Sequence, residues 1–169
     1  AHFPAYISDI GIDAYYAGLA LMLIGLFNIF GSLASGFISG RFSMPKFLAW
    51  IYIGRSIAVT AFLLTPQTPT TVIIFAAVMG VLWLSTVPPT NALVALMFGT
   101  RYLGMLGGLV FFSHQIGSFL GVWLGGYLYD HFGTYDPVWW LGVILGLFAA
   151  IVHWPIKDRP IDRELVAGV

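Results

Sequence analysis

Long apolar runs alternate with short polar connectors along the chain. The apolar runs cover about residues 15–39, 47–64, 71–98, 103–128 and 138–156. A transmembrane helix needs about 20 mostly apolar residues, so each run is long enough to cross a bilayer. The connectors "SDIGID", "RFSMP", "TPQTPTT", "GTRY" and "YDHFGTYDP" carry residues that are typical of turns. The pattern predicts an all-α, polytopic membrane helix bundle with five complete transmembrane helices.

The two ends of the chain do not fit this alternation. Residues 1–7 are too short to span, and "HFPAYI" reads as the last turns of a further helix. We therefore expect a six-helix bundle over residues 1–157, with its first helix truncated, and a solvated tail over residues 158–169. The chain starts without Met, which suggests one segment of a longer polypeptide. Within the bundle, Asp13 is a candidate N-cap, and Pro137 suits a first helical turn.

Composition supports a membrane protein and excludes several other classes. Hydrophobic residues make up 59% of the 169, and only 8% are charged. A soluble domain of this size cannot hide that much apolar surface. The net charge is zero, and no basic block indicates nucleic acid. The chain has no cysteine, and its four histidines are scattered without a chelating pair, so we expect neither a metal site nor a cofactor.

The charges between the runs indicate an orientation. Lys and Arg fall on one side if the helices alternate: Arg41, Lys46, Arg101, Lys157, Arg159 and Arg163. The opposite connectors carry acidic residues instead: Asp9, Asp13, Asp130 and Asp136. By the positive-inside rule the first side is cytoplasmic, and so is the C-terminal tail.

Polar and small residues mark helix faces that we do not expect to meet lipid. In the run 15–39 one face carries Gly18, Gly25, Asn28, Ser32, Ser35 and Ser39, because their spacing follows steps of three and four. In the run 103–128, Gly117, Gly121 and Gly125 form small-xxx-small repeats, which are typical of close helix packing in membranes. Helix contact alone explains most of these glycines.

Three adjacent polar side chains, Ser113, His114 and Gln115, lie near the middle of the run 103–128. Polar groups are costly in hydrocarbon, so we expect them to line a path. His114 changes charge near physiological pH, which leaves a proton-relay or solute-binding role open. The alternative is a neutral imidazole that bonds to Asn28 or to a backbone carbonyl.

The segment "WLSTVPPTNAL" interrupts the run 71–98. Pro88 and Pro89 have no N–H to donate to the carbonyls of Leu84 and Ser85. Nearby hydroxyls from Ser85 or Thr86 satisfy those carbonyls in a simple kink. Alternatively the carbonyls face a wet cavity, as in the interrupted helices of transporters.

Arg55 is the only formal charge deep inside a run. Arginine at the bilayer centre costs about 2.5–3.5 kcal/mol on insertion scales. Two interpretations stay open. Arg55 either reaches toward the cytoplasm or anchors helix packing through backbone carbonyls, or it meets an anionic solute. The candidate residues for solute binding or for lining a pathway are therefore Asn28, Arg55, Trp83, Ser85, Asn91, Ser113, His114 and Gln115.

Three stretches carry a resemblance to a known family: "GLFNIFGSLASGFISGRFSMPK", "FGTRYLGMLGGLVFFSHQIGSFLGVWLGGYLYDHFGTYDPVWW" and "HWPIKDRP". Together they resemble the C-terminal half of a major facilitator superfamily transporter. The chain is most similar to bacterial members of the monocarboxylate transporter and oxalate–formate antiporter branch, and the resemblance covers residues 1–160.

The resemblance implies a twelve-helix protein of two six-helix halves, in which helices one, two, four and five of each half line the cavity. The partners it implies are a small solute, the lipid bilayer and the N-terminal half of the same transporter. The implied function is a secondary active transporter in the bacterial cytoplasmic membrane, a symporter or antiporter that moves a monocarboxylate or another organic anion by alternating access.

Two other functions were weighed against transport. A non-transporting membrane scaffold or assembly subunit fits the same helices. An intramembrane hydrolase would use His114 and Ser118, which share a helix face. A helical serine hydroxyl more often bonds the carbonyl four residues earlier, and no third group or oxyanion site accompanies the pair, so we do not expect an enzyme.

Overall fold

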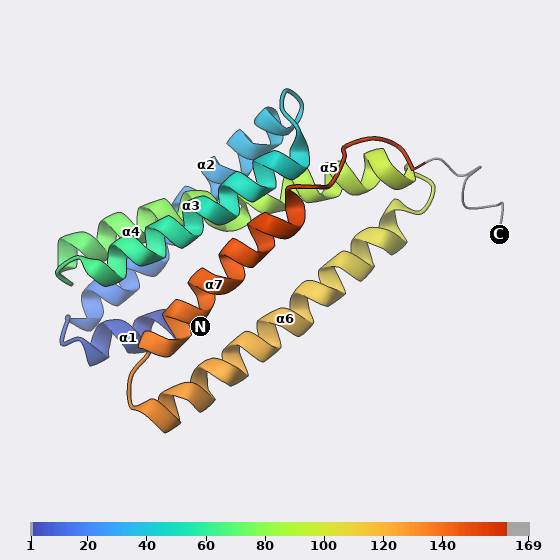
Figure 1. The fold of residues 1–169 in the computed structure, drawn as a ribbon. Coiled ribbons are helices and arrows are strands. Elements are labelled where there is room, and N and C mark those ends of the chain that lie inside the picture. Colours follow the sequence, from blue (N-terminus) through green and yellow to red (C-terminus); the bar gives the residue numbers. More distant parts are fainter. Residues whose placement is uncertain (1, 162–169) are drawn as a thin grey trace.

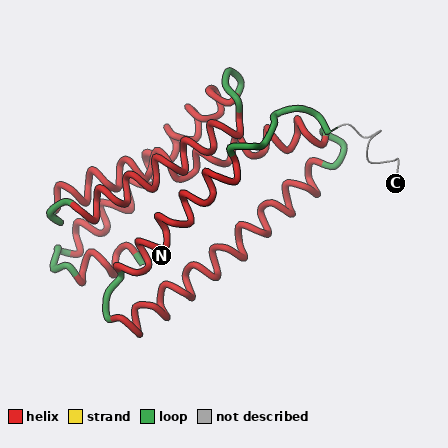
Figure 2. The backbone as a smooth tube through the Cα atoms, in the orientation of Figure 1, coloured by secondary structure: helices red, strands yellow, loops and turns green. Residues whose placement is uncertain are grey.

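The computed structural model describes residues 2–161, in which every regular element is a helix (Figures 1 and 2). The elements are α1 (Phe3–Asp9), α2 (Ala14–Ser39), α3 (Met44–Leu64), α4 (Pro69–Trp83), the 3-10 helix η1 (Leu84–Thr86), α5 (Val87–Phe98), α6 (Leu103–Phe132) and α7 (Asp136–His153). The all-α architecture is therefore confirmed for these residues.

Within residues 2–161, five helical segments are long and apolar enough to cross a membrane: Ala14–Ser39, Met44–Leu64, Pro69–Phe98, Leu103–Phe132 and Asp136–His153. They coincide with the five apolar runs of the sequence. The fourth segment continues past residue 128 and ends at Phe132, because Gly133 supplies a left-handed C-cap with φ 70°. The third is one span in length but is interrupted by η1.

Local signals for the helix ends are confirmed. The Asp13 carboxylate accepts a hydrogen bond from the N–H of Tyr15 at 2.7 Å and caps α2. Pro137 lies in the first turn of α7, where its missing N–H costs nothing. At the start of α4, Thr68 and Thr71 form a reciprocal capping box that the sequence analysis did not anticipate.

Two helix pairs, α2 with α4 and α3 with α7, make the most extensive contacts between elements. The α2–α4 contact depends on two glycines. A Cβ at Gly31 would lie 2.0 Å from the carbonyl oxygen of Val81, and a Cβ at Gly80 would lie 2.8 Å from that of Ile24. The two backbones therefore touch directly, an approach that only glycine permits.

One end of the bundle is closed by an aromatic cluster that joins α1, α3, α4 and α7. Phe62 and Phe75 stack at 4.2 Å between ring centroids, and Phe3, Tyr6 and Trp139 surround them edge-on or tilted. Aromatic pairs in these geometries add about 0.5–1.5 kcal/mol each beyond their burial. The cluster fixes the short helix α1 against the longer ones.

Helix α6 is different from the others. Figure 1 shows it running beside the bundle and joined to it at both ends. No residue of its most apolar 18-residue window is buried. Within residues 2–161 the close packing expected at Gly117, Gly121 and Gly125 occurs only at Gly125, where a Cβ would meet the His2 ring, whereas a Cβ at Gly117 or Gly121 would meet no atom of another element within 4 Å.

The charged connectors lie at opposite ends of the bundle, as alternation predicts. Arg41, Arg101 and Lys157 lie in the α2–α3 turn, the α5–α6 turn and the segment after α7, at the upper right of Figure 1. A backbone hydrogen bond of 3.0 Å from Ile161 to Met97 holds that last segment against the end of α5. The other end of the bundle carries Asp9, Asp13, Asp130 and Asp136.

Candidate functional site

The most irregular part of the described spans is the break between α4 and α5. At η1 the bonding changes from the α-helical to the 3-10 pattern, and the N–H of Val87 donates to Leu84. Pro88 and Pro89 follow at once and contribute no donors. The structure thus has a short 3-10 interruption where the sequence left open a kink or a broken helix.

Hydroxyls do satisfy carbonyls at the break, although not those that we expected. The buried Ser85 hydroxyl donates to the carbonyl of Val81, and the Thr90 hydroxyl donates to that of Thr86 at 2.6 Å. The expected acceptors were Leu84 and Ser85. The carbonyl of Leu84 is instead served by the backbone N–H of Val87.

Arg55 reaches the break from α3. Its Nε and Nη2 donate to the carbonyl oxygen of Leu82 at 3.1 and 2.6 Å, and Nη2 also donates to that of Trp83. The guanidinium carbon lies 5.3 Å from the centroid of the Tyr52 ring and 5.8 Å from that of Trp83. This geometry matches the interpretation in which Arg55 anchors backbone carbonyls.

Asn28 reaches the same break from α2. Its Oδ1 accepts a hydrogen bond of 3.1 Å from the N–H of Leu84. Four candidate residues therefore meet here, namely Asn28, Arg55, Trp83 and Ser85. Asn91 lies farther along α5 with an exposed side chain.

The polar triad of α6 lies elsewhere. Ser113, His114 and Gln115 are all exposed. The Ser113 hydroxyl donates to the carbonyl of Val110 at 2.8 Å, and the His114 ring lies 6.3 Å from that of Phe111. Within residues 2–161 no hydrogen bond joins His114 to Asn28, and Asn28 Oδ1 instead accepts from the N–H of Leu84.

An apolar pocket of about 470 Å³ opens between α1, α2, α4 and α7. Trp83 forms one wall, with Leu21 and Ile24 from α2 and Met79 from α4. The indole N–H of Trp139, which also lines the pocket, is buried without a hydrogen-bond partner. The break between α4 and α5 thus borders a cavity through Trp83.

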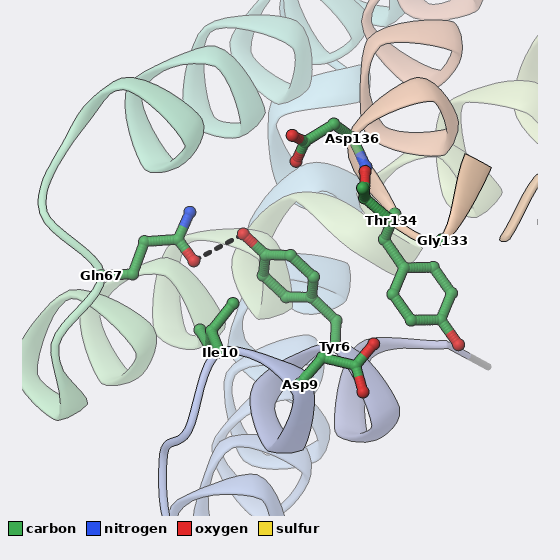
Figure 3. A pocket seen from close by; sticks show the side chains of 8 residues that line it. Tyr6, Asp9, Ile10, Gln67, Gly133, Thr134 and Asp136 are labelled. Carbon is green, nitrogen blue, oxygen red and sulfur yellow. Dashed lines mark hydrogen bonds between the residues drawn. The ribbon is translucent and has the colours of Figure 1, made fainter.

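A second, more polar pocket of about 340 Å³ lies at the aspartate end (Figure 3). The Tyr6 hydroxyl donates to the side-chain oxygen of Gln67 across it, with Asp9 and Asp136 on its rim. This pocket was not predicted from the sequence, in which only the two aspartates indicated it. Among residues 2–161 no group of three His, Asp or Glu side chains is arranged to hold a metal ion.

The sequence matches the family model of the Major Facilitator Superfamily over residues 2–167. That match covers nearly the whole chain. The chain belongs to the Major Facilitator Superfamily. The resemblance seen in the sequence was correct at this level, and the superfamily is one of membrane transport proteins rather than of enzymes.

Two relatives narrow the comparison within the superfamily. The chain is 23% identical over 139 residues to monocarboxylate transporter 12-B of Danio rerio. The matched residues cover 80% of this chain and 29% of the relative. It is 28% identical over 153 residues to monocarboxylate transporter 13 of Rattus norvegicus, covering 87% of this chain and 34% of the relative. The chain therefore spans about a third of the length of these superfamily members. No solved structure matches it.

Proposed function

We propose that this chain is the C-terminal half of a secondary active transporter that moves a small monocarboxylate, or another organic anion, by alternating access. Superfamily membership supports transport, and both reported relatives are named as monocarboxylate transporters. The five membrane-spanning segments and the short α1 fit one six-helix half whose first helix is incomplete.

The observation that carries the proposal is the exposed polar triad on α6. Ser113, His114 and Gln115 lie inside an apolar helix whose most apolar 18-residue window has no buried residue. Exposed polar groups at this depth are costly in lipid but not beside water. An aqueous pathway between α6 and an N-terminal half of the transporter removes that cost.

The pathway-lining residues in this proposal are Asn28, Trp83, Ser85, Asn91, Ser113, His114 and Gln115. His114 is the group suited to bind a carboxylate or to carry a proton, because imidazole gains a positive charge near neutral pH. Arg55 is not included as a solute ligand, since its guanidinium is engaged by the carbonyls of Leu82 and Trp83.

The proposed orientation places the turns with Arg41 and Arg101, and the C-terminal tail from residue 158, in the cytoplasm. Support comes from the separation of charges, since the described Lys and Arg side chains of the connectors gather at one end of the bundle. With the bacterial resemblance of the sequence, the proposed location is the bacterial cytoplasmic membrane.

A transport assay tests the proposal. The full-length protein is reconstituted in liposomes and supplied with labelled L-lactate under an inward proton gradient. We expect uptake of labelled lactate, and we expect unlabelled pyruvate to compete with it. A protonophore, or exchange conditions, should change the uptake rate. Absence of flux with lactate, pyruvate and formate, together with stable co-purification of another membrane protein, would instead favour a scaffold.

Cysteine labelling tests the pathway itself, and this chain contains no native cysteine. We expect a hydrophilic maleimide to label His114→Cys in at least one transport state. Leu145→Cys, at an exposed apolar position of α7, is the matched control, which this proposal places against lipid and which should stay unlabelled. Protection of position 114 in every state would contradict the proposed pathway.

A further inference from the structure

We propose that Arg55 is a positioning residue for transport, which completes the broken turn between α4 and α5 and thereby fixes Trp83 and the direction of α5. The inference rests on the proposed function in so far as it assigns the break to a transport pathway. The role assigned to Arg55 is to position the backbone, which is distinct from binding the solute.

At the break, backbone carbonyls of the turn before η1 lack their usual helical donors. The change to i→i+3 bonding at η1 deprives carbonyls of the preceding turn of their usual donors four residues ahead. Carbonyls without partners in a membrane interior cost several kcal/mol. The Arg55 guanidinium donates to the carbonyl of Leu82 in that turn, and also to that of Trp83, the N-cap of η1. Arg55 thus replaces part of the missing helical ladder.

Arginine suits this task better than lysine does. One guanidinium presents donors in a planar fork and serves two adjacent carbonyls at once, which an ammonium on a shorter chain does less well. Hydrogen bonds from a charged donor are also roughly twice as strong as neutral ones. The break is therefore held by the strongest kind of donor that a side chain offers.

Trp83 connects the break to the apolar pocket. Arg55 holds Trp83 by its carbonyl and lies 5.8 Å from its ring centroid. The same Trp83 ring is a wall of the apolar pocket of about 470 Å³. A side chain of α3, which does not line that pocket, in this way sets the position of one that does.

A second side chain, Asn28, holds the break by accepting a hydrogen bond, where Arg55 donates. Asn28 on α2 accepts the hydrogen bond of the Leu84 N–H, while Arg55 on α3 donates to the carbonyls just before it. A broken helix has lost the ladder that keeps its two parts collinear, so its angle depends on such side chains. The two side chains fix the angle from both neighbouring helices.

The experiment measures transport and helix geometry on the same full-length variants. Lactate uptake gives KM and turnover, and pairs of spin labels at Ile74→Cys on α4 and Leu96→Cys on α5 report the angle across the break. Both positions have exposed side chains. For Arg55→Met we expect turnover to fall about tenfold with KM within about threefold, and the distance distribution to broaden. Tenfold corresponds to about 1.4 kcal/mol, the scale of one hydrogen bond to a charged group.

Arg55→Lys keeps the charge and decides the question if Arg55→Met does not reach the membrane. We expect it to fold, to broaden the label distribution and to lower turnover. The matched control is Arg101→Met, since that guanidinium lies 5.3 Å from the centroid of the neighbouring Tyr102 ring, in the α5–α6 turn. It should change neither turnover nor distances.

Two results would overturn the inference. A large rise in KM at unchanged turnover and unchanged label distances would make Arg55 a solute ligand. Unchanged distances in both Arg55 variants would show that the break does not depend on the guanidinium, whatever the transport result. If the unmodified protein takes up no lactate, the proposed function fails, and the label distances still decide whether Arg55 holds the break.

Discussion

Replacing Gly31 by alanine should separate α2 from α4. The added Cβ would lie 2.0 Å from the carbonyl oxygen of Val81 and 2.7 Å from its carbon. These are backbone atoms of a helix, so they cannot rotate away as the end of a flexible side chain does. Ordinary contact begins at about 3.4 Å. The two helices must therefore move apart by more than 1 Å.

The cost follows from that displacement. Overpacking a tight contact costs about 1–3 kcal/mol, and occasionally more when backbone must shift. The displacement also lengthens the 3.1 Å bond from the Leu84 N–H to Asn28, worth about 1 kcal/mol. Alanine returns up to about 1 kcal/mol of helix propensity over glycine. We expect a net loss of about 1–3 kcal/mol in the free energy of unfolding.

The assay is reversible unfolding of the full-length protein in mixed micelles, followed by tryptophan fluorescence. Gly142→Ala is the matched control, because a Cβ added at this helical glycine of α7 would meet no atom of another element within 4 Å. It should be neutral or slightly stabilising. If Gly31→Ala loses less than about 1 kcal/mol relative to Gly142→Ala, the backbone contact is not as close as described.

Three further predictions concern single side chains. Asp13→Ala should cost about 1 kcal/mol of stability in the same unfolding assay, because it removes the cap of α2, and Asp13→Asn should restore most of it. Ser56→Ala should cost about 1 kcal/mol there, since the buried hydroxyl donates to the Val143 carbonyl between α3 and α7. His114→Ala should impair lactate uptake more than thermal stability, whereas Leu120→Ala should affect neither strongly; a lowered melting point alone would make His114 a packing residue.

Features that depend on neighbours in sequence were predictable. The five spans follow from the length of apolar runs, and no tertiary contact is needed to see them. Asp13 caps an N–H only two residues ahead, and Pro137 needs only a first turn. The break at Pro88 and Pro89 was equally visible, because a missing donor is a property of the residue itself.

Features that depend on how the helices face one another were not predictable. Arg55 donates to carbonyls 27 and 28 positions away, and nothing in the sequence distinguishes those carbonyls from others. The periodic face of α2 is a further example. Gly18 is exposed while Ser35 is buried, although both lie on the predicted face. Periodicity tells which residues share a face, but not which part of it meets another helix.

The 3-10 interruption has a consequence for biogenesis. Helix α4 has 15 residues and α5 has 12, so they rise only about 22 and 18 Å, and neither crosses a hydrocarbon core of about 30 Å alone. The insertion machinery must accept both as one unit. Arg55 enters earlier, with α3, and stays uncompensated until that unit arrives. Nascent α3 and its successor should therefore leave the translocon as a pair.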